Sequence, residues 1–434
     1  MSPIIVGVIG FVLLFILVFS CRIPIGIAMA LIGFLGFVHL VGIDAGLGIL
    51  RTVPFRTAGS YTLSVVPLFV LMGDFAFRSG LSQELYSFGH KWLGRLPGGL
   101  AMGTIGACAG FAAICGSSQA GSATMGLVAF PEMKRYGYGD SLASATIAAG
   151  GTLGILIPPS IGFILFSILT EVSVGKLFIA GILPGILLAF LLMLAIYIVA
   201  RRKPHLAPRG PEVSFKEKLQ TIKGIWAVAI LFALVMGGIY AGFFTPTEAG
   251  GVGAFGVAVI GLARKKINWK GIFSALVTTG RITGMFFLIL IGAMIFGYFL
   301  AITRLPFELS DLLTRLALPR HLILTVILLF LLGLGCVMEA LSILLLTIPV
   351  IFPTIVALGF DPIWYGIISV IVGEMALITP PVGQNVFILS GVLEDVPVFT
   401  IYRGVLPFVL AMAACIVILT IFPQIALFLP GLMR

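Results

Sequence analysis

Apolar residues fill most of the chain in long stretches, and polar residues are concentrated in short breaks between and within these stretches. The stretches 3–20, 225–243 and 405–422 can each cross about 30 Å of hydrocarbon as a single helix. Further apolar helices are expected at 23–42, 62–80, 176–200, 248–263 and 282–302. The pattern therefore predicts an all-α protein that crosses a membrane several times.

The same pattern of glycines and prolines occurs twice, 222 residues apart. Leu96-Pro97 returns as Leu318-Pro319, Phe130-Pro131 as Phe352-Pro353, Gly151 as Gly373, and Pro158-Pro159 as Pro380-Pro381. Each Pro-Pro pair interrupts a long apolar segment, where a helix is otherwise expected. Paired interruptions at matching places in two halves are the sequence pointer to the binding site of a secondary transporter.

This repetition predicts two halves joined by a basic linker. The first repeat covers residues 1–200, with a re-entrant hairpin at about 98–130 and a broken helix at about 138–170. The linker is 201–223, and the second repeat covers 224–434, with a hairpin at about 320–352 and a broken helix at about 361–392. Amphipathic arm helices are expected at 44–60 and 264–281. Five spans in each half would make the repeats inverted, with the linker cytoplasmic and both termini external.

The interruptions carry the candidate chemistry. Non-helical backbone within a membrane is tolerated only where protein or water satisfies it. Proline removes a backbone donor, so the two Pro-Pro pairs should free carbonyl groups near 154–157 and 376–379. Carbonyl and hydroxyl oxygens suit Na⁺, and the N-termini of the half-helices after each break favour an anion between them. The pattern indicates a cation-coupled anion symporter.

Two acids, Glu339 and Glu374, lie deepest in apolar surroundings. A buried acid in a membrane segment is a functional hypothesis by default. Na⁺ ligation, a structural hydrogen bond to the backbone, and proton carriage all remain open for both residues. Glu374 is interpreted as a structural or coupling acid.

Composition agrees with a membrane protein and excludes other classes. Hydrophobic residues make up 60% of the 434 positions, charged residues 10%, and the mean hydropathy is +1.21. The net charge of +10 has its densest basic run in the linker, so it indicates topology and not nucleic-acid binding. No HExxH or P-loop motif occurs, and no GxGxxG stands before a helix; Gly137-Tyr138-Gly139-Asp140 lacks a partner aspartate for intramembrane proteolysis. The chain is predicted not to be an enzyme and to need no organic cofactor.

Several of these motifs resemble the large membrane subunit of TRAP transporters, the tripartite ATP-independent periplasmic uptake systems. The resemblance rests on Gly116-Ser117-Ser118, on Gly151–Pro159 and above all on Thr379-Pro380-Pro381-Val382-Gly383-Gln384-Asn385. It implies a scaffold plus an elevator-type transport domain in a bacterial or archaeal cytoplasmic (inner) membrane. It also implies Na⁺-coupled uptake of an organic acid such as a C4-dicarboxylate or sialic acid. The implied partners are a separate small four-helix membrane subunit and a periplasmic substrate-binding protein.

The resemblance also assigns residues to the site. It implies that Na⁺ is bound by Gly116, Ser117, Ser118, Gly151, Thr152 and Gly154 in the first half, and by Gly335, Met338, Glu339, Thr379, Pro380 and Gly383 in the second. The substrate would lie between them, at Ser118, Gln119, Pro158, Pro159, Ser160, Pro381, Val382 and Asn385. The alternative is a stand-alone cation-coupled anion symporter or exchanger of similar fold that needs no binding protein.

Overall fold

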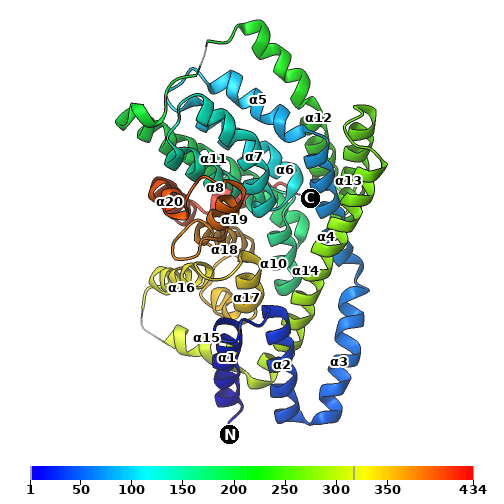
Figure 1. Ribbon diagram of the computed structural model, residues 1–434. Helices are drawn as coiled ribbons and strands as arrows, with labels where there is room; N and C mark the ends of the chain where they lie inside the picture. Colours follow the sequence, from blue (N-terminus) through cyan, green and yellow to red (C-terminus); the bar gives the residue numbers. More distant parts are fainter. Residues whose placement is uncertain (1, 211, 316–317, 434) are drawn as a thin grey trace.

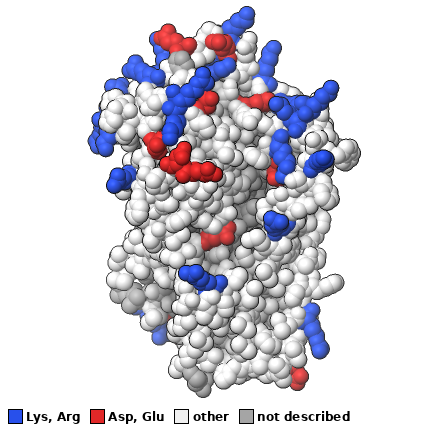
Figure 2. Space-filling view, in the orientation of Figure 1, with Lys and Arg blue, Asp and Glu red and all other residues white. Residues whose placement is uncertain are grey.

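Helices account for all the regular structure in residues 2–210, 212–315 and 318–433, which the computed structural model describes (Figure 1). In these ranges, seven helices are long and apolar enough to cross a membrane, or up to eight if the bent helix at 140–170 counts as one span. Figure 2 shows a largely uncharged surface over the middle of the molecule, with Lys and Arg gathered mainly at one end. The prediction of an all-α polytopic membrane protein is confirmed.

A first group of helices, here called the scaffold helices, includes one long helix, α14, against which α1, α2, α3, α4 and α15 pack. The group comprises α1 (Pro3–Phe19), α2 (Ile25–Val41), α3 (Ile43–Ala58), α4 (Val65–Arg78, after the 3₁₀ turn Tyr61–Ser64), α5 (Leu81–Leu93), α12 (Phe215–Tyr240), α13 (Pro246–Ala263), α14 (Trp269–Thr303) and α15 (Leu305–Arg315). Glycines let α2 and α14 touch backbone to backbone: a Cβ at Gly292 would lie 2.0 Å from the Gly26 carbonyl oxygen. Small residues commonly mark such contacts between membrane helices.

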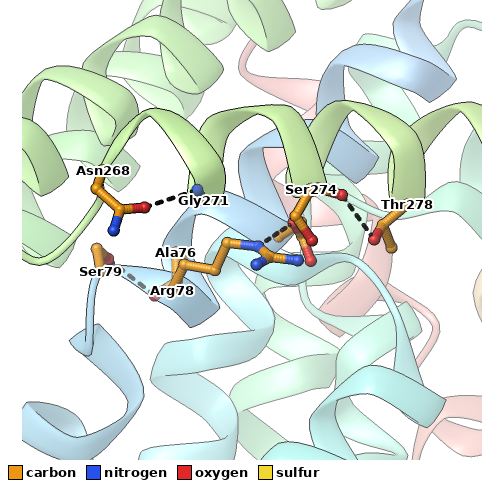
Figure 3. A network of polar contacts seen from close by, with 8 residues as sticks. Ala76, Arg78, Ser79, Asn268, Gly271, Ser274 and Thr278 are labelled. Atoms are coloured by element: carbon orange, nitrogen blue, oxygen red, sulfur yellow. Dashed lines mark hydrogen bonds and ion pairs between the residues drawn. The ribbon is translucent and has the colours of Figure 1, made fainter.

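Helix α14 differs from the prediction of an arm at 264–281 followed by a separate helix. It is continuous over 35 residues, and it begins where Asn268 Oδ1 accepts a hydrogen bond from the Gly271 amide over 2.8 Å (Figure 3). Polar residues lower the hydropathy of its first half but do not interrupt the helix. The Thr278 hydroxyl, for example, donates to the Ser274 carbonyl one turn earlier in the same helix. Helices α5 and α15 were not predicted at all.

A second group, here called the hairpin unit, contains both hairpins and both broken helices. Its members are α6 (Gly99–Cys115), α7 (Ser118–Arg135), α8 (Asp140–Gly151), α9 (Leu153–Leu156), α10 (Ile161–Thr170) and α11 (Val174–Arg202) from the first half, and α16 (Arg320–Gly335), α17 (Ala340–Ala357), α18 (Pro362–Ala376), α19 (Gln384–Val392), α20 (Val398–Ile421) and α21 (Gln424–Gly431) from the second. The 3₁₀ turn Pro204–Leu206 follows α11. The first broken helix bends by 42° at its break.

The two hairpins approach one another from opposite ends of the molecule. In Figure 1 the hairpin α6–α7 lies above the centre and the hairpin α16–α17 lies below it. Their tips meet, because a hydrogen bond of 2.8 Å joins Gln119 at the first tip to Glu339 at the second. The arrangement brings both hairpin tips and both helix breaks to one place in the middle of the fold.

Candidate functional site

The tip of the first hairpin lies directly on the break of the first broken helix. Gly116 turns the chain with φ +64°, which favours glycine, and a Cβ there would lie 2.8 Å from the Pro159 carbonyl oxygen. A Cβ at Gly154 would lie 2.6 Å from the Ser117 carbonyl oxygen. Ser117 then caps α7 by accepting a hydrogen bond from the Ala120 amide. The structure therefore brings together the first-half residues that the sequence suggested as a cluster.

The tip of the second hairpin meets the second break in a similar way. The Val382 amide donates to the Cys336 carbonyl oxygen over 3.1 Å. Gly383 has φ +52°, and the carbonyl oxygens of Leu377 and Thr379 lie 3.3 and 3.2 Å from where its Cβ would be. Backbone oxygens thus converge at this break, as they do at the first.

Two side-chain hydrogen bonds connect the halves across the centre. The Ser118 hydroxyl donates to Glu374 Oε2 over 2.6 Å, and Gln119 Nε2 donates to Glu339 Oε1 over 2.8 Å. In each case a residue of the first hairpin tip holds an acid of the second half. The sequence singled out all four residues but did not predict these pairings.

A cavity of about 300 Å³ separates the hairpin tips from the scaffold helices. Ser117, Gln119 and Glu339 form its polar wall, and Leu377 also lines it. The opposite wall is apolar and consists of Val66 and Val70 of α4 together with Ile282, Met285, Phe286 and Ile289 of α14. A small organic molecule fits such a space in both size and lining.

The apolar wall was missed by the sequence analysis. Residues on a membrane helix that face a cavity are as apolar as those that face lipid, so hydropathy does not separate the two. A faint signal was present in α14, where Arg281 and Thr283 flank the cavity-lining residue Ile282.

The predicted substrate residues occupy different environments. Gln119 lines the cavity, whereas Ser118 and Asn385 are fully buried behind the tips. Pro158, Pro159 and Ser160 are buried in the first break, where Ser160 caps α10 by accepting from the Phe163 amide. Pro381 is exposed at the second break, as is Pro380, which was predicted to bind Na⁺. The Tyr402 hydroxyl there contacts the carbonyl oxygens of Pro381 and Val382.

The cavity has an unusual charge for an anion site. No Lys or Arg is among the described residues that line it, and its one ionisable side chain is the acid Glu339. Positive potential instead comes from helix N-termini, since α7 begins at Ser118 and α17 begins directly after Glu339. A bound anion would need further positive charge.

The donors around the two breaks fit Na⁺ better than a transition metal. The described residues contain no cluster of three or more His, Cys, Asp or Glu side chains that could hold a metal ion. The breaks present carbonyl oxygens, and the buried Ser122 hydroxyl lies 1.9 Å from where a Cβ of Gly151 would be, with no hydrogen-bond partner among the described residues. Hard oxygen donors of this kind suit hard cations. The Thr152 hydroxyl donates to the Ala149 carbonyl over 2.6 Å and keeps its lone pairs, and Met338 is buried beside the second tip.

Two hairpins that meet at two helix breaks in the core of a polytopic helical protein define a membrane transporter of the broken-helix class. The chain matches the family "Tripartite ATP-independent periplasmic transporter, DctM component" over residues 11–425. It therefore belongs to this family of TRAP transporter large permeases, and the resemblance inferred from the Gly-Ser-Ser and Thr-Pro-Pro motifs is confirmed.

Relatives in this family support the assignment, and one solved structure supports the fold. The chain is 39% identical to the C4-dicarboxylate TRAP transporter large permease protein DctM of Pseudomonas aeruginosa, covering 87% of this chain and 88% of the relative. It is 30% identical to the sialic acid TRAP transporter large permease protein SiaM of Vibrio cholerae, covering 86% and 87%. The fold resembles the crystal structure of the Alcanivorax borkumensis YdaH transporter, with a TM-score of 0.63, 18% identity, and 90% and 89% of the two chains covered.

Proposed function

We propose that the chain carries out Na⁺-coupled uptake of an organic acid through the cavity between the hairpin tips and α14. The observation that carries this proposal is the charge of the cavity. An anion that enters it meets the acid Glu339 and no basic side chain from the described residues. The oxygen-rich breaks of the two broken helices lie beside the cavity, each against a hairpin tip. They offer places where Na⁺ could supply the missing positive charge.

The arrangement favours binding of Na⁺ before the anion. Na⁺ at the two breaks would offset the charge of Glu339 and hold the loops at the tips in place. A first ligand that orders these loops lowers the ordering cost for the second ligand. Linkage then requires the anion to raise the affinity for Na⁺ by the same factor, which is the basis of obligatory coupling.

The substrate class comes from the size of the cavity and from the relatives. A volume of about 300 Å³ accommodates a small carboxylate. The similar proteins from P. aeruginosa and V. cholerae are named for C4-dicarboxylates and for sialic acid. An organic acid of this kind is the proposed substrate, and a tripartite system would receive it from a periplasmic binding protein and work with a small membrane subunit.

The proposed movement is an elevator, in which the hairpin unit slides as one body along the scaffold helices. The wall that α14 presents to the cavity supports this, because Met285, Phe286 and Ile289 are apolar and make no polar bonds that would have to break during sliding. Within the hairpin unit, by contrast, the contacts that join the two halves are polar and short.

The proposed orientation places the linker end of the molecule in the cytoplasm. Lys and Arg gather at one end of the molecule (Figure 2). At the linker end, Arg201 and Arg202 in the last turn of α11 and Lys203 directly after it are exposed. Cytoplasmic loops of membrane proteins collect Lys and Arg. Both chain termini would then lie on the external face of the inner membrane.

The test is uptake of labelled C4-dicarboxylates and sialic acid into proteoliposomes that contain the chain and its small subunit. Uptake is measured with and without the binding protein, under an inward Na⁺ gradient and under an equal K⁺ gradient. The proposal predicts uptake only when both Na⁺ and the binding protein are present. Uptake without the binding protein would favour the stand-alone symporter, and equal uptake in K⁺ would contradict Na⁺ coupling.

A further inference from the structure

Glu374 is a buried acid with a hydrogen bond to only one of its two carboxylate oxygens. It lies in the last turn of α18 with no exposed surface, and its Oε2 atom accepts from the Ser118 hydroxyl over 2.6 Å. Its Oε1 atom is buried, and no described residue hydrogen-bonds to it. No Lys, Arg or His of the described chain lies within ion-pair distance of this carboxylate. An ionised carboxylate in such surroundings needs a positive charge that the protein does not supply.

Asn385 presents a second set of unused polar atoms beside the same helix end. Its side chain has no exposed surface, and neither the amide oxygen nor the amide nitrogen has a partner among the described residues. Its backbone amide donates to the Leu377 carbonyl over 3.0 Å, which places the first turn of α19 against the end of α18. Buried amide groups in proteins almost always have partners, so this one points to an absent ligand.

Helix α7 supplies a third unused group from the other half of the chain. A Cβ at Gly126 would lie 2.7 Å from Leu389 Cδ1, so α7 and α19 pack side by side. Ser122 and Asn385 each lie about one turn before these contact residues. The Ser122 hydroxyl is fully buried and has no hydrogen-bond partner among the described residues.

We propose that Glu374 and Asn385, together with the hydroxyl groups of Ser118 and Ser122, hold a further Na⁺ inside the hairpin unit. The carboxylate, amide and hydroxyl oxygens are the hard donors that such a cation prefers. This inference rests on the proposed Na⁺-coupled function, and it adds a cation next to the first break, with which it shares the hydroxyl groups of Ser118 and Ser122. The cation would neutralise the buried carboxylate of Glu374. It would move together with the hairpin unit, to which both halves of the chain contribute.

The repeat predicts one such site and not a pair. The residue that corresponds to Glu374 in the first half is Thr152. Its side chain is a neutral hydroxyl, so this position has no charge to be compensated. The additional cation therefore belongs to the second half alone.

The experiment is equilibrium binding of radioactive Na⁺ to the purified full chain in detergent, without substrate. Glu374→Gln keeps the size of the side chain and its contact with Ser118 but removes the charge. We expect this variant to bind one Na⁺ fewer per chain than the wild type. Glu374→Asp should keep the wild-type number with weaker affinity, and Glu308→Gln on the exposed side of α15 should bind as the wild type does.

The possible outcomes separate this inference from the proposed function. Equal numbers of bound Na⁺ in the wild type and Glu374→Gln would overturn the additional site, even if transport is slower. Absence of Na⁺ binding in the wild type would instead overturn Na⁺ coupling itself. If Glu374→Gln does not fold, Asn385→Ala and Glu374→Asp test the additional site instead. The site predicts about tenfold weaker binding of one Na⁺ in each of these variants. Unchanged Na⁺ affinity in both would overturn the additional site.

Discussion

Gln119 Nε2 donates a hydrogen bond of 2.8 Å to Glu339 Oε1, joining residues 220 positions apart at the tips of opposite hairpins. Both side chains face the central cavity. The contact is an acid–amide pair in which one negative charge is held by a neutral donor. It makes the cavity sensitive to any second negative charge at the tips.

Exchanging the two partners tests this contact. Gln119→Glu places two carboxylates within hydrogen-bond distance, and like charges this close cannot both ionise without cost. We expect the affinity for the anion to fall about tenfold, which is about 1.4 kcal/mol. The double variant Gln119→Glu with Glu339→Gln restores an acid–amide pair and should recover much of the loss. Substrate binding to purified protein measures both, and equal losses in the single and double variants would contradict a direct pairing.

Gly154 at the first break is predicted to be required because there is no room for a side chain at this position. A Cβ at Gly154 would lie 2.6 Å from the carbonyl group of Ser117, so Gly154→Ala must displace the tip of the first hairpin. We expect a loss of about 1–3 kcal/mol in stability, as for other overpacked sites, together with weaker Na⁺ binding. Gly333→Ala in α16 is the matched control, because no atom lies within 4 Å of its Cβ position. Thermal unfolding of both variants in detergent provides the comparison.

Hydroxyl oxygens near the breaks are predicted to set the affinity for Na⁺. The Thr379 hydroxyl donates to the Met375 carbonyl over 2.6 Å and keeps its lone pairs for a cation. Thr379→Ala and Ser118→Ala should each raise the Na⁺ concentration for half-maximal uptake about tenfold while expression stays normal. Thr379→Ser retains the hydroxyl and should behave as the wild type. Unchanged Na⁺ activation in both alanine variants would count against these oxygens as ligands.

The backbone contact between α2 and α14 should be needed for stability and not for coupling. Gly292→Leu would force Gly26 away, because even a Cβ would lie 2.0 Å from the Gly26 carbonyl oxygen. We expect a drop in the unfolding temperature, with Na⁺ dependence unchanged in the protein that remains folded. Gly297→Leu on the same helix is the control, since its Cβ position is open. Similar unfolding temperatures in the two variants would contradict this role for the contact.

The sequence predicted the hairpins and breaks well because glycine and proline act locally. Pro158-Pro159 and Pro380-Pro381 interrupt helices wherever they stand, and α8–α10 and α18–α19 break at these positions. Helix α14 was divided in error because hydropathy falls at Thr278 and Arg281 although the helix continues. Helix α5, which packs on α6, was missed because its many polar residues do not form an apolar stretch.

The contacts that build the site could not be predicted in the same way. Ser118 and Glu374 were both singled out, but their spacing does not reveal that a tip of the first half bonds to a break of the second. Such pairings depend on how the two halves pack, and each hairpin could have contacted only its own broken helix. The apolar cavity wall on α14 carries no local signal either.

The central claim is that Na⁺, and not a basic side chain, supplies the positive charge that holds the anion. The most direct measurement is equilibrium binding of the transported organic acid to purified protein over a range of Na⁺ concentrations, with choline keeping the ionic strength constant. The account predicts that affinity falls steeply as Na⁺ is withdrawn, because the cavity then presents only Glu339 to the anion. Equal affinity in choline and in Na⁺ would contradict it.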